Sequence, residues 1–191
     1  MRQLILVRHA PTEATRSFTF PADEPLDEPG RAAAAAFGSA HAEHGETLCS
    51  PMLRCRQTAE AAGLAGVRVV AELAECDFGT WAGRTLAEVC AEDAAAARAW
   101  MADPLASPHG GECLDAFMAR IGGWLDLQAE LDGPALAITH GGVVKAAVVH
   151  ALRAPVGAFW RIEATPLSVT ELHSHDDRWT VTRVNAGVTP P

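Results

Sequence analysis

The stretch Leu4-Ile5-Leu6-Val7-Arg8-His9-Ala10 runs four apolar residues directly into an arginine and a histidine. An unbroken apolar run of this kind is typical of a strand buried on both faces of a parallel sheet. Arg8 and His9 would then lie at the carboxyl end of the strand, where open α/β sheets bind their ligands. A guanidinium beside an imidazole can hold an oxyanion and attack its centre. For this pair alone, two solvated residues at a strand end are the simpler alternative.

A second buried strand is predicted for residues 135–139, and it also ends in a histidine, His140. Gly141 and Gly142 follow and open a predicted helix over 143–152. Glycine lets the backbone approach a ligand closely, and a helix N-terminus favours an anion beside the imidazole. A polar turn with a satisfied histidine is the alternative, but two separate strands that end in histidine weaken it.

Strands alternate with helices along most of the chain, which predicts one doubly wound α/β domain over residues 1–191 with a single, mostly parallel sheet and helices on both faces. Residues 11–30 carry four prolines and the acidic residues Asp23, Glu24, Asp27 and Glu28, and are expected to form a loop over the mouth of the sheet. The remaining pattern predicts helices over 31–44, 51–62, 85–102 and 112–131, strands over 47–50 and 66–71, an irregular segment over 72–83, and a hairpin from 167–172 and 179–184.

Composition restricts the possible partners. The 191 residues carry a formal net charge of −9 at pH 7, which argues against non-specific binding to nucleic acid or to an anionic membrane. No apolar run is long enough to span a bilayer, and the N-terminus lacks the layout of a signal peptide. We therefore expect a cytoplasmic protein with a small-molecule partner. Whether it forms a homodimer is left open.

The five cysteines, at positions 49, 55, 76, 90 and 113, are odd in number and show no CxxC spacing. They are predicted to be reduced thiols, several of them buried. The spacing does not suit a zinc site, so neither a metal nor a cofactor is expected.

The segment from Ser50 to Ala59 contributes a further positively charged residue, Arg54. Ser50 and Pro51 are typical of a helix start, with the serine as N-cap, and Arg54 then falls in the first turn. A helix N-terminus and a guanidinium together suit a phosphate. Arg56 would face away from Arg54 and is expected at the surface.

Two carboxylates lie in the apolar, glycine-marked segment from Leu73 to Gly83. A carboxyl group among apolar side chains has a raised pKa and can serve as a general acid, which favours Glu75. Asp77 is expected to cap or pair locally. Two solvated loop acids are the alternative.

These units fit one chemistry, in which an imidazole attacks phosphorus while two arginines and the second histidine balance the charge on the phosphoryl oxygens. A carboxylic acid protonates the leaving oxygen, and the same carboxylate then activates water. Because protein cations supply the compensation, no metal is required.

The chain resembles the histidine phosphatase superfamily, the phosphoglycerate mutase-like proteins, over about residues 3 to 150. Five motifs of the family occur here in the family's order. They are the Arg-His-Gly signature at 8–10, the Ser-Pro-x-x-Arg-x-x-x-Thr-Ala segment at 50–59, the Glu-x-x-x-Gly-x-x-x-Gly loop at 75–83, the Gly-Gly-Glu segment at 110–112 and the His-Gly-Gly segment at 140–142. The resemblance implies His9 as nucleophile, Glu75 as proton donor, and Arg8, Arg54 and His140 as the phosphate pocket.

The chain departs from the family pattern in two places. Ala10 replaces the glycine after the nucleophile, and Thr15 stands where an asparagine is often found. Thr15 still offers a hydroxyl and is retained, together with Gly141, as a candidate phosphate contact.

The predicted activity is that of a metal-independent phosphomonoesterase acting on a small phosphorylated metabolite, and the compact form resembles α-ribazole phosphatases and broad-specificity phosphatases. A phosphoglycerate mutase-type transfer is the alternative, but the segment over 16–26 lacks a basic cluster for a second substrate charge. A phosphate-ester-binding module without turnover is the alternative of another class. Phe18, Phe20, Trp81 and Trp160 are candidates for an apolar leaving-group pocket, with core packing as the expected role of Trp160. No role is assigned to His109, His173 or His175.

Overall fold

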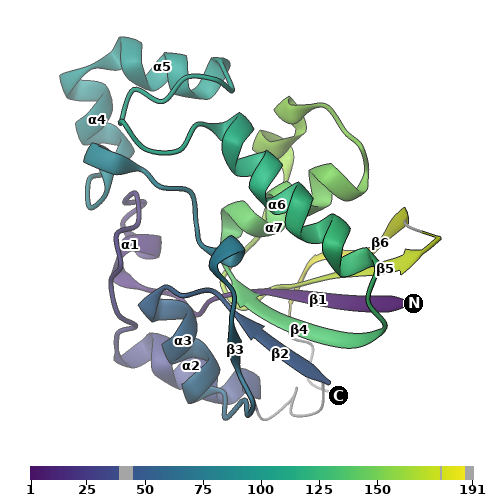
Figure 1. Ribbon diagram of the computed structural model, residues 1–191. Helices are drawn as coiled ribbons and strands as arrows, with labels where there is room; N and C mark the ends of the chain where they lie inside the picture. The colour runs from purple at the N-terminus through teal and green to yellow at the C-terminus, as the bar shows by residue number, and fades with distance from the viewer. Residues whose placement is uncertain (39–44, 177, 188–191) are drawn as a thin grey trace.

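A computed structural model describes residues 1–38, 45–176 and 178–187. Within them, six strands form one sheet in the order β3-β2-β4-β1-β5-β6 (Figure 1). The strands are β1 (Arg2–Arg8), β2 (Glu46–Cys49), β3 (Arg68–Val69), β4 (Gly133–Thr139), β5 (Val169–His175) and β6 (Arg178–Ala186). β1 to β4 pair in parallel, and β5 and β6 add an antiparallel hairpin at one edge.

The helices lie on both faces of this sheet. They are α1 (Glu13–Arg16), α2 (Glu28–Gly38), α3 (Leu53–Ala61), α4 (Leu86–Glu92), α5 (Ala94–Ala102), α6 (Leu114–Ala129) and α7 (Gly141–Ala151), with 3-10 turns η1 (Ala71–Leu73), η2 (Gly79–Trp81) and η3 (Val156–Arg161). α6 and α7 cover one face, and α2 and α3 cover the other (Figure 1). The predicted fold class is therefore confirmed.

The apolar run of β1 is buried from both sides, as the sequence predicts. Leu4 and Leu6 belong to the core cluster that includes Phe117 of α6, whereas Val7 belongs to the cluster that includes Phe37 of α2. Because side chains of a strand alternate between faces, one short segment joins the two halves of the core.

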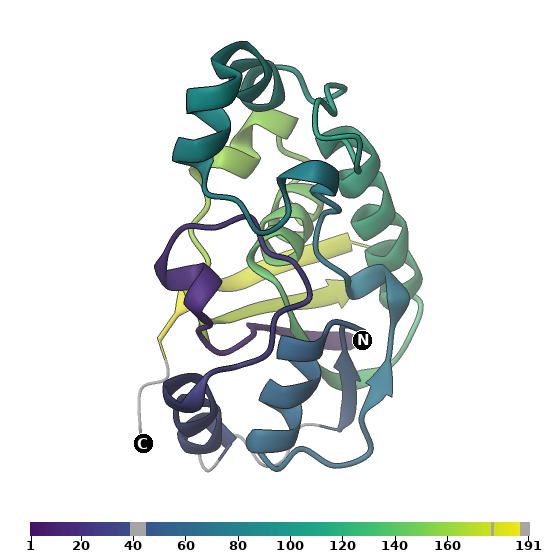
Figure 2. The ribbon, with the colours of Figure 1, turned by 90° about the vertical axis from the view of Figure 1, so that its left-hand side faces the viewer.

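The register of the central strands brings two predicted site segments together. Arg8 pairs with Thr139 where β1 and β4 run in parallel, so His9 and His140 follow at the same edge of the sheet. Figure 2 views this edge and shows the segment with α1 crossing in front of it, with α4 and α5 to one side and α2 and α3 to the other.

Most of the predicted helices and strands are present. Their boundaries differ from the predicted ones where capping residues determine the ends of helices. α6 buries Leu114, Phe117, Ile121, Trp124 and Leu125 on one side, and the C-terminal hairpin forms as expected. Thr85 makes the predicted capping box with Glu88, but Asp93 divides the expected helix by capping α5.

Four predictions of local structure differ from the structure. α3 begins at Leu53 with Met52 as N-cap, so Ser50 does not cap it. The strand expected over 66–71 forms only two paired residues, and the loop expected over 11–30 contains α1 and the start of α2. The helix expected over 31–44 occupies Glu28–Gly38, and residues 39–44 lie outside the described residues.

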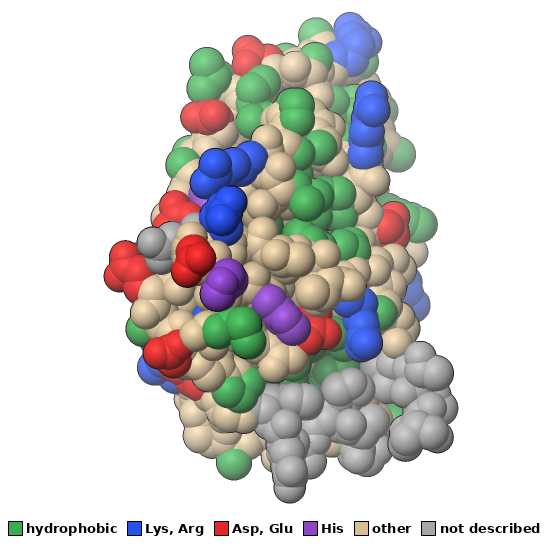
Figure 3. All heavy atoms as spheres, turned by 90° about the vertical axis from the view of Figure 1, so that its right-hand side faces the viewer, with side chains coloured by type: hydrophobic (Ala, Val, Ile, Leu, Met, Phe, Trp, Pro, Cys, Tyr) green, Lys and Arg blue, Asp and Glu red, His purple; other side chains and the backbone are tan. Residues whose placement is uncertain are grey.

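Charge is distributed without a single dominant sign on the face that carries the ends of β5 and β6. Acidic and basic side chains are interspersed there with histidines (Figure 3). Among the described residues, no helix combines the length and apolarity needed to cross a membrane.

Candidate active site

His9 lies immediately after β1 and is almost completely buried. Its Nδ1 is 2.7 Å from the Ala10 carbonyl oxygen, which can only accept, so Nδ1 carries the proton. Nε2 is therefore the atom with the free lone pair. Burial lowers the pKa of His9 well below its usual value, and the nearby Arg54 and Arg8 guanidinium groups lower it further. The ring is neutral at neutral pH, as a nitrogen nucleophile must be.

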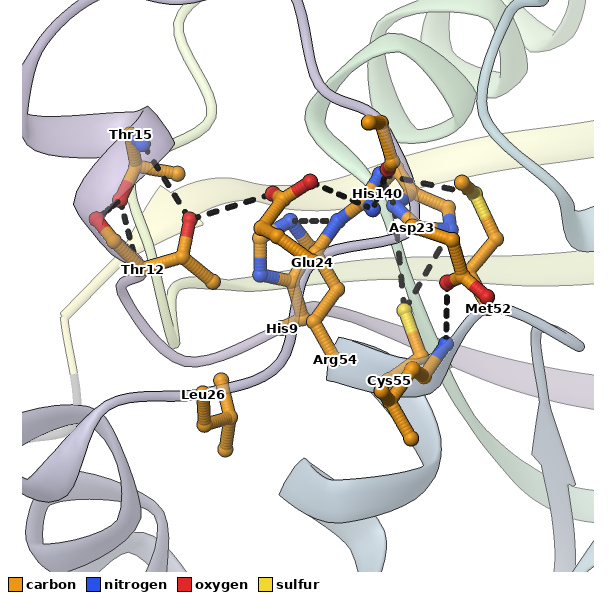
Figure 4. Close-up of polar contacts among 12 residues, drawn as sticks. His9, Thr12, Thr15, Asp23, Glu24, Leu26, Met52, Arg54, Cys55 and His140 are labelled. Carbon is orange, nitrogen blue, oxygen red and sulfur yellow. Dashed lines mark hydrogen bonds and ion pairs between the residues drawn. The ribbon is translucent and has the colours of Figure 1, made fainter. Parts of the chain in front are cut away.

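Arg54, the second residue of α3, connects the two histidines (Figure 4). Its Nε donates to His9 Nε2 at 3.1 Å, and its Nη2 lies 3.0 Å from His140 Nδ1. Its Nη1 donates to the Ala22 carbonyl at 2.7 Å. The side chain is 0% exposed, so its charge acts in a region of low polarity. The predicted place of Arg54, in the first turn of a helix, is confirmed.

His140 follows β4 and is the N-cap residue of α7. Because Arg54 donates to its Nδ1, the proton of His140 lies on Nε2 and is donated to Ser50 Oγ at 2.7 Å. Burial, Arg54 and His9 lower the pKa of His140 well below its usual value. The ring centroids of His9 and His140 are 5.3 Å apart. Ser50 thus orients the second histidine instead of capping a helix.

Arg8 ends β1 and is half-buried beside His9. Its Nη1 donates to the Ala164 carbonyl at 2.7 Å, and its buried Nε has no hydrogen-bond partner among the described residues. Burial lowers the pKa of Arg8, while the charges of Glu75 and Glu163 oppose that shift. An anion at this position would give the unpaired N–H an acceptor.

Glu75 is half-buried in the segment between η1 and η2. The backbone N–H of Gly142 donates to its Oε2 at 3.2 Å, and the N–H of Cys76 donates to its Oε1 at 3.1 Å. Arg120 of α6 steadies the same segment, because its Nη1 donates to the Glu72 carbonyl at 2.5 Å and to the Ala74 carbonyl at 3.0 Å. Asp77 makes the local bond that was expected, accepting from Gly79 N–H at 2.9 Å.

The reacting groups open onto a cavity of about 180 Å³. Its lining brings together Arg8, His9, Thr15, Glu24 and Glu75. Arg54 and His140 lie behind His9 and complete the cluster from the core side, as Figure 4 shows. The structure therefore gathers the predicted candidates from four separate parts of the chain.

Thr15 lines this cavity, but its hydroxyl is already engaged. Its Oγ1 donates to the Thr12 carbonyl at 2.7 Å and accepts from Thr12 N–H at 2.8 Å, which forms the capping box of α1. Gly141 lies against Arg8, since a Cβ there would stand 3.4 Å from the Arg8 Nε. Gly141 therefore contacts Arg8, a predicted phosphate-binding residue, whereas Thr15 forms part of the cavity wall.

Glu24 is a member of the site that the sequence did not single out. One carboxylate oxygen accepts from Thr12 Oγ1 at 3.3 Å, and the other lies 3.6 Å from Arg54 Nη1 without a hydrogen-bond partner among the described residues. The only sequence signal was the acidic character of the loop over residues 11–30. Ser50 and Arg120 were also missed, because each acts through a contact distant in sequence.

Among the described residues, the cysteines and the histidines other than His9 and His140 take no part in this cluster as reactive groups. Cys55 Sγ lies 3.4 Å from His140 Nε2, but burial raises the pKa of its thiol well above the usual value. His109 is buried against Phe78 and Trp81, and His173 and His175 lie on β5. In the described part of the chain, no group of three or more His, Cys, Asp or Glu residues could hold a metal ion.

This arrangement suits an anion with tetrahedral oxygens. Two guanidinium groups and two neutral imidazoles surround the point at which His9 Nε2 faces the cavity. An arginine donates in a planar fork that matches phosphate oxygens, and an unprotonated imidazole nitrogen can attack phosphorus. A carboxyl group stands on the same cavity wall, where a leaving oxygen would need a proton.

Comparison with known proteins identifies a family and several similar chains. The model of the histidine phosphatase superfamily (branch 1) matches residues 4–187. A bifunctional protein of Mycobacterium tuberculosis is 31% identical over 184 residues, which cover 90% of this chain and 50% of that protein. The chain thus spans about half the length of such relatives.

Two further proteins match over more of their length. A glucosyl-3-phosphoglycerate phosphatase of Mycobacterium tuberculosis is 31% identical over 176 residues, covering 81% of this chain and 77% of the relative. The solved structure of an alpha-ribazole phosphatase from Shigella flexneri superposes with a TM-score of 0.85, covering 98% of this chain and 99% of that one. Because the two sequences are 24% identical, the similarity to the Shigella structure shows the fold alone.

Proposed function

Because this chain belongs to the histidine phosphatase superfamily, we propose that it is a phosphomonoesterase that hydrolyses a small phosphorylated metabolite through a phosphohistidine intermediate. One observation carries the proposal. Arg54 donates to His9 Nε2 at 3.1 Å and reaches His140 Nδ1 at 3.0 Å, so the nucleophilic nitrogen and its charge partners form one buried unit.

In the first step, the lone pair of His9 Nε2 attacks phosphorus and the bond to the ester oxygen breaks. The incoming phosphoryl group replaces the hydrogen bond between Arg54 Nε and His9 Nε2, so that Arg54 binds a phosphoryl oxygen instead. Arg8 binds a second oxygen through its unpaired Nε–H. The Ala10 carbonyl holds the Nδ1 proton and stabilises the charge that develops on the ring.

Glu75 is the proposed general acid and base. In its protonated form it gives a proton to the leaving oxygen, which departs as an alcohol. Its carboxylate then takes a proton from water, which attacks phosphorus, breaks the P–N bond and releases inorganic phosphate. The bond from Gly142 N–H to Oε2 holds the carboxyl group in place at 3.2 Å. Since Arg8 and Arg54 supply the positive charge, the reaction is proposed to need no metal.

The substrate is proposed to be small, because the cavity at His9 measures about 180 Å³. α-Ribazole phosphate, which the resemblance of the sequence suggests, and glucosyl-3-phosphoglycerate, for which a 31% identical protein is described as the phosphatase, are the first candidates. Phosphoglycerate mutase-type transfer is the alternative, but Arg8 is the only Lys or Arg in the described lining of this cavity, and Glu24 adds a negative charge. Residues 1–191 are proposed to act as one cytoplasmic domain.

The deciding experiment is hydrolysis of phenyl phosphate in the presence of a chelator by the wild type, His9→Ala and Arg56→Ala. Arg56 is the matched control because it is exposed on the same helix as Arg54. The proposal predicts turnover that survives the chelator, persists in Arg56→Ala and is lost in His9→Ala. Turnover by His9→Ala would overturn the nucleophile assignment. Binding of inorganic phosphate without hydrolysis of any ester would favour a binding module, and transfer between phosphoglycerates would favour a mutase.

A further inference from the structure

A second cavity of about 170 Å³ lies next to the first. Glu75 and Phe78 line both cavities. Because Glu75 is the proposed donor to the leaving oxygen, the atoms beyond that oxygen would extend from the first cavity past Glu75 into the second. Its position makes the second cavity a candidate for the leaving-group subsite.

Aromatic rings form most of the wall of this second cavity. Trp100 of α5 packs edge-on against Trp160 of η3, with ring centroids 4.9 Å apart, and Phe159 lies 5.1 Å from Trp160. Trp160 is 39% exposed, so the expectation that it packs in the core is wrong. Phe20 and Trp81 are buried and pack against Phe78 and Trp100 without lining the second cavity themselves, and Phe18 is 85% exposed. Rings of this kind bind the flat apolar face of a ligand.

Lys145 is the one polar group with a positive charge in this wall. It is the single lysine of the whole chain and lies on α7, three residues after Gly142 and on the same face of the helix. Its Nζ is 5.5 Å from the centroid of the Phe159 ring. Among the described residues it forms no ion pair with a carboxylate.

The Lys145 side chain is half-buried, so it is partly removed from water without a carboxylate partner among the described residues, which carries a free-energy cost. The aromatic rings offset part of this cost through the cation–π contact. A carboxylate or another anion on the ligand would offset more of it. The lining of the cavity therefore offers aromatic side chains for an apolar ring of the ligand and the Lys145 ammonium group for a negatively charged group on the same ligand.

Building on the function proposed above, we propose that this cavity binds the leaving group of the substrate and that Lys145 selects esters whose leaving group carries a carboxylate beside a ring with an apolar face. Phe78, Trp100, Phe159 and Trp160 hold the ring face. Lys145 is a specificity-determining residue and takes no part in the transfer of the phosphoryl group.

The test compares phenyl phosphate with 3-carboxyphenyl and 4-carboxyphenyl phosphate, which share the ring and differ in the carboxylate. The wild type is expected to favour at least one carboxylated ester by about tenfold in kcat/KM, through a lower KM. Lys145→Met is expected to abolish that preference, and Lys145→Arg to retain most of it. Arg56→Met removes an exposed cation outside the cavity and is expected to keep the wild-type preference.

Binding of the products by titration calorimetry separates this proposal from the proposed function. 3- or 4-Hydroxybenzoate is expected to bind the wild type more tightly than phenol, and Lys145→Met is expected to remove the difference. That result would support the subsite even if no ester were hydrolysed. Hydrolysis of phenyl phosphate that depends on His9, with no preference for a carboxylated ester or product, would overturn the subsite and leave the phosphatase proposal standing. A preference that persists in Lys145→Met would also overturn it.

Discussion

At the scale of single residues, Arg54 and Glu24 define how tightly an anion is held. Arg54 is fully buried and uses three of its nitrogens on His9, His140 and Ala22. Glu24 lines the cavity at His9, accepts a hydrogen bond from Thr12 and lies 3.6 Å from the same guanidinium. A carboxylate so close to the proposed phosphate position repels an incoming dianion and competes with it for Arg54.

Glu24→Gln is accordingly expected to strengthen inhibition by inorganic phosphate by about fivefold, the ratio that corresponds to about 1 kcal/mol of removed repulsion. The glutamine keeps the shape and can still accept from Thr12. The measurement is the inhibition constant of phosphate at constant ionic strength. Glu28→Gln is the control, because Glu28 is exposed at the start of α2. Equal inhibition constants for wild type and Glu24→Gln would refute the repulsive role.

At the scale of elements, the start of α7 organises the acid side of the site. Gly142 N–H donates to Glu75 Oε2, and a Cβ on Gly142 would lie 2.2 Å from Glu75 Oε1. A Cβ on the preceding Gly141 would make only ordinary contact with Arg8, at 3.4 Å and beyond. A side chain at Gly142 would therefore displace Glu75, whereas a Cβ at Gly141 has room, although both glycines lie in the first turn of the same helix.

Gly142→Ala is therefore expected to displace the Glu75 carboxylate and to lower kcat by about 100-fold, the scale of a lost general acid. Gly141→Ala is expected to lower kcat far less. Both variants are expected to remain folded, because the atom nearest to the Cβ of Gly142→Ala is the end of the flexible Glu75 side chain, and the buried Phe117 ring, 3.2 Å from that Cβ, needs to shift by only a few tenths of an ångström. Parallel kinetics and thermal melts check this. Similar kcat values for the two variants would count against a positioned Glu75.

The strand ends and their polar residues were predictable, because apolar runs buried on both faces identify β1 and β4 without knowledge of their neighbours. The start of α3 was not predictable from its serine and proline, because Ser50 has a stronger partner in His140, distant in sequence, at 2.7 Å. The length of β3 was overestimated because only Arg68 and Val69 pair with β2, and both are exposed at the edge of the sheet. The roles proposed for Glu24 and Lys145 depend on the cavities that these residues line in the complete fold, so the sequence alone does not predict them.

At the scale of the whole molecule, the site makes the fold sensitive to acid. Burial keeps His9 and His140 neutral, with pKa values well below the usual one. In the unfolded chain, both titrate near the ordinary value of about 6.5. As pH falls below that value, the unfolded state binds protons that the folded state does not, so the free energy of unfolding decreases.

We expect the free energy of unfolding to fall between pH 7 and pH 5 by at most about 1.4 kcal/mol per pH unit for each of these histidines. Urea denaturation at several pH values measures this slope. His9→Gln, which cannot titrate, should have a shallower slope than the wild type over the same range. A wild-type free energy of unfolding that stays constant or rises as pH falls would contradict the neutral state of both rings.

The pairing of β1 with β4 also bears on how the protein reaches its active form. β1 is the first strand along the chain and β4 is the fourth, yet they lie side by side, and their ends carry the two histidines. Contacts between segments so distant in sequence require a long loop to close, which makes them slow to form. During synthesis, the nucleophile leaves the ribosome well before the histidine that shares Arg54 with it. The newly made chain therefore stays without the proposed phosphate pocket until the segment through His140 has emerged.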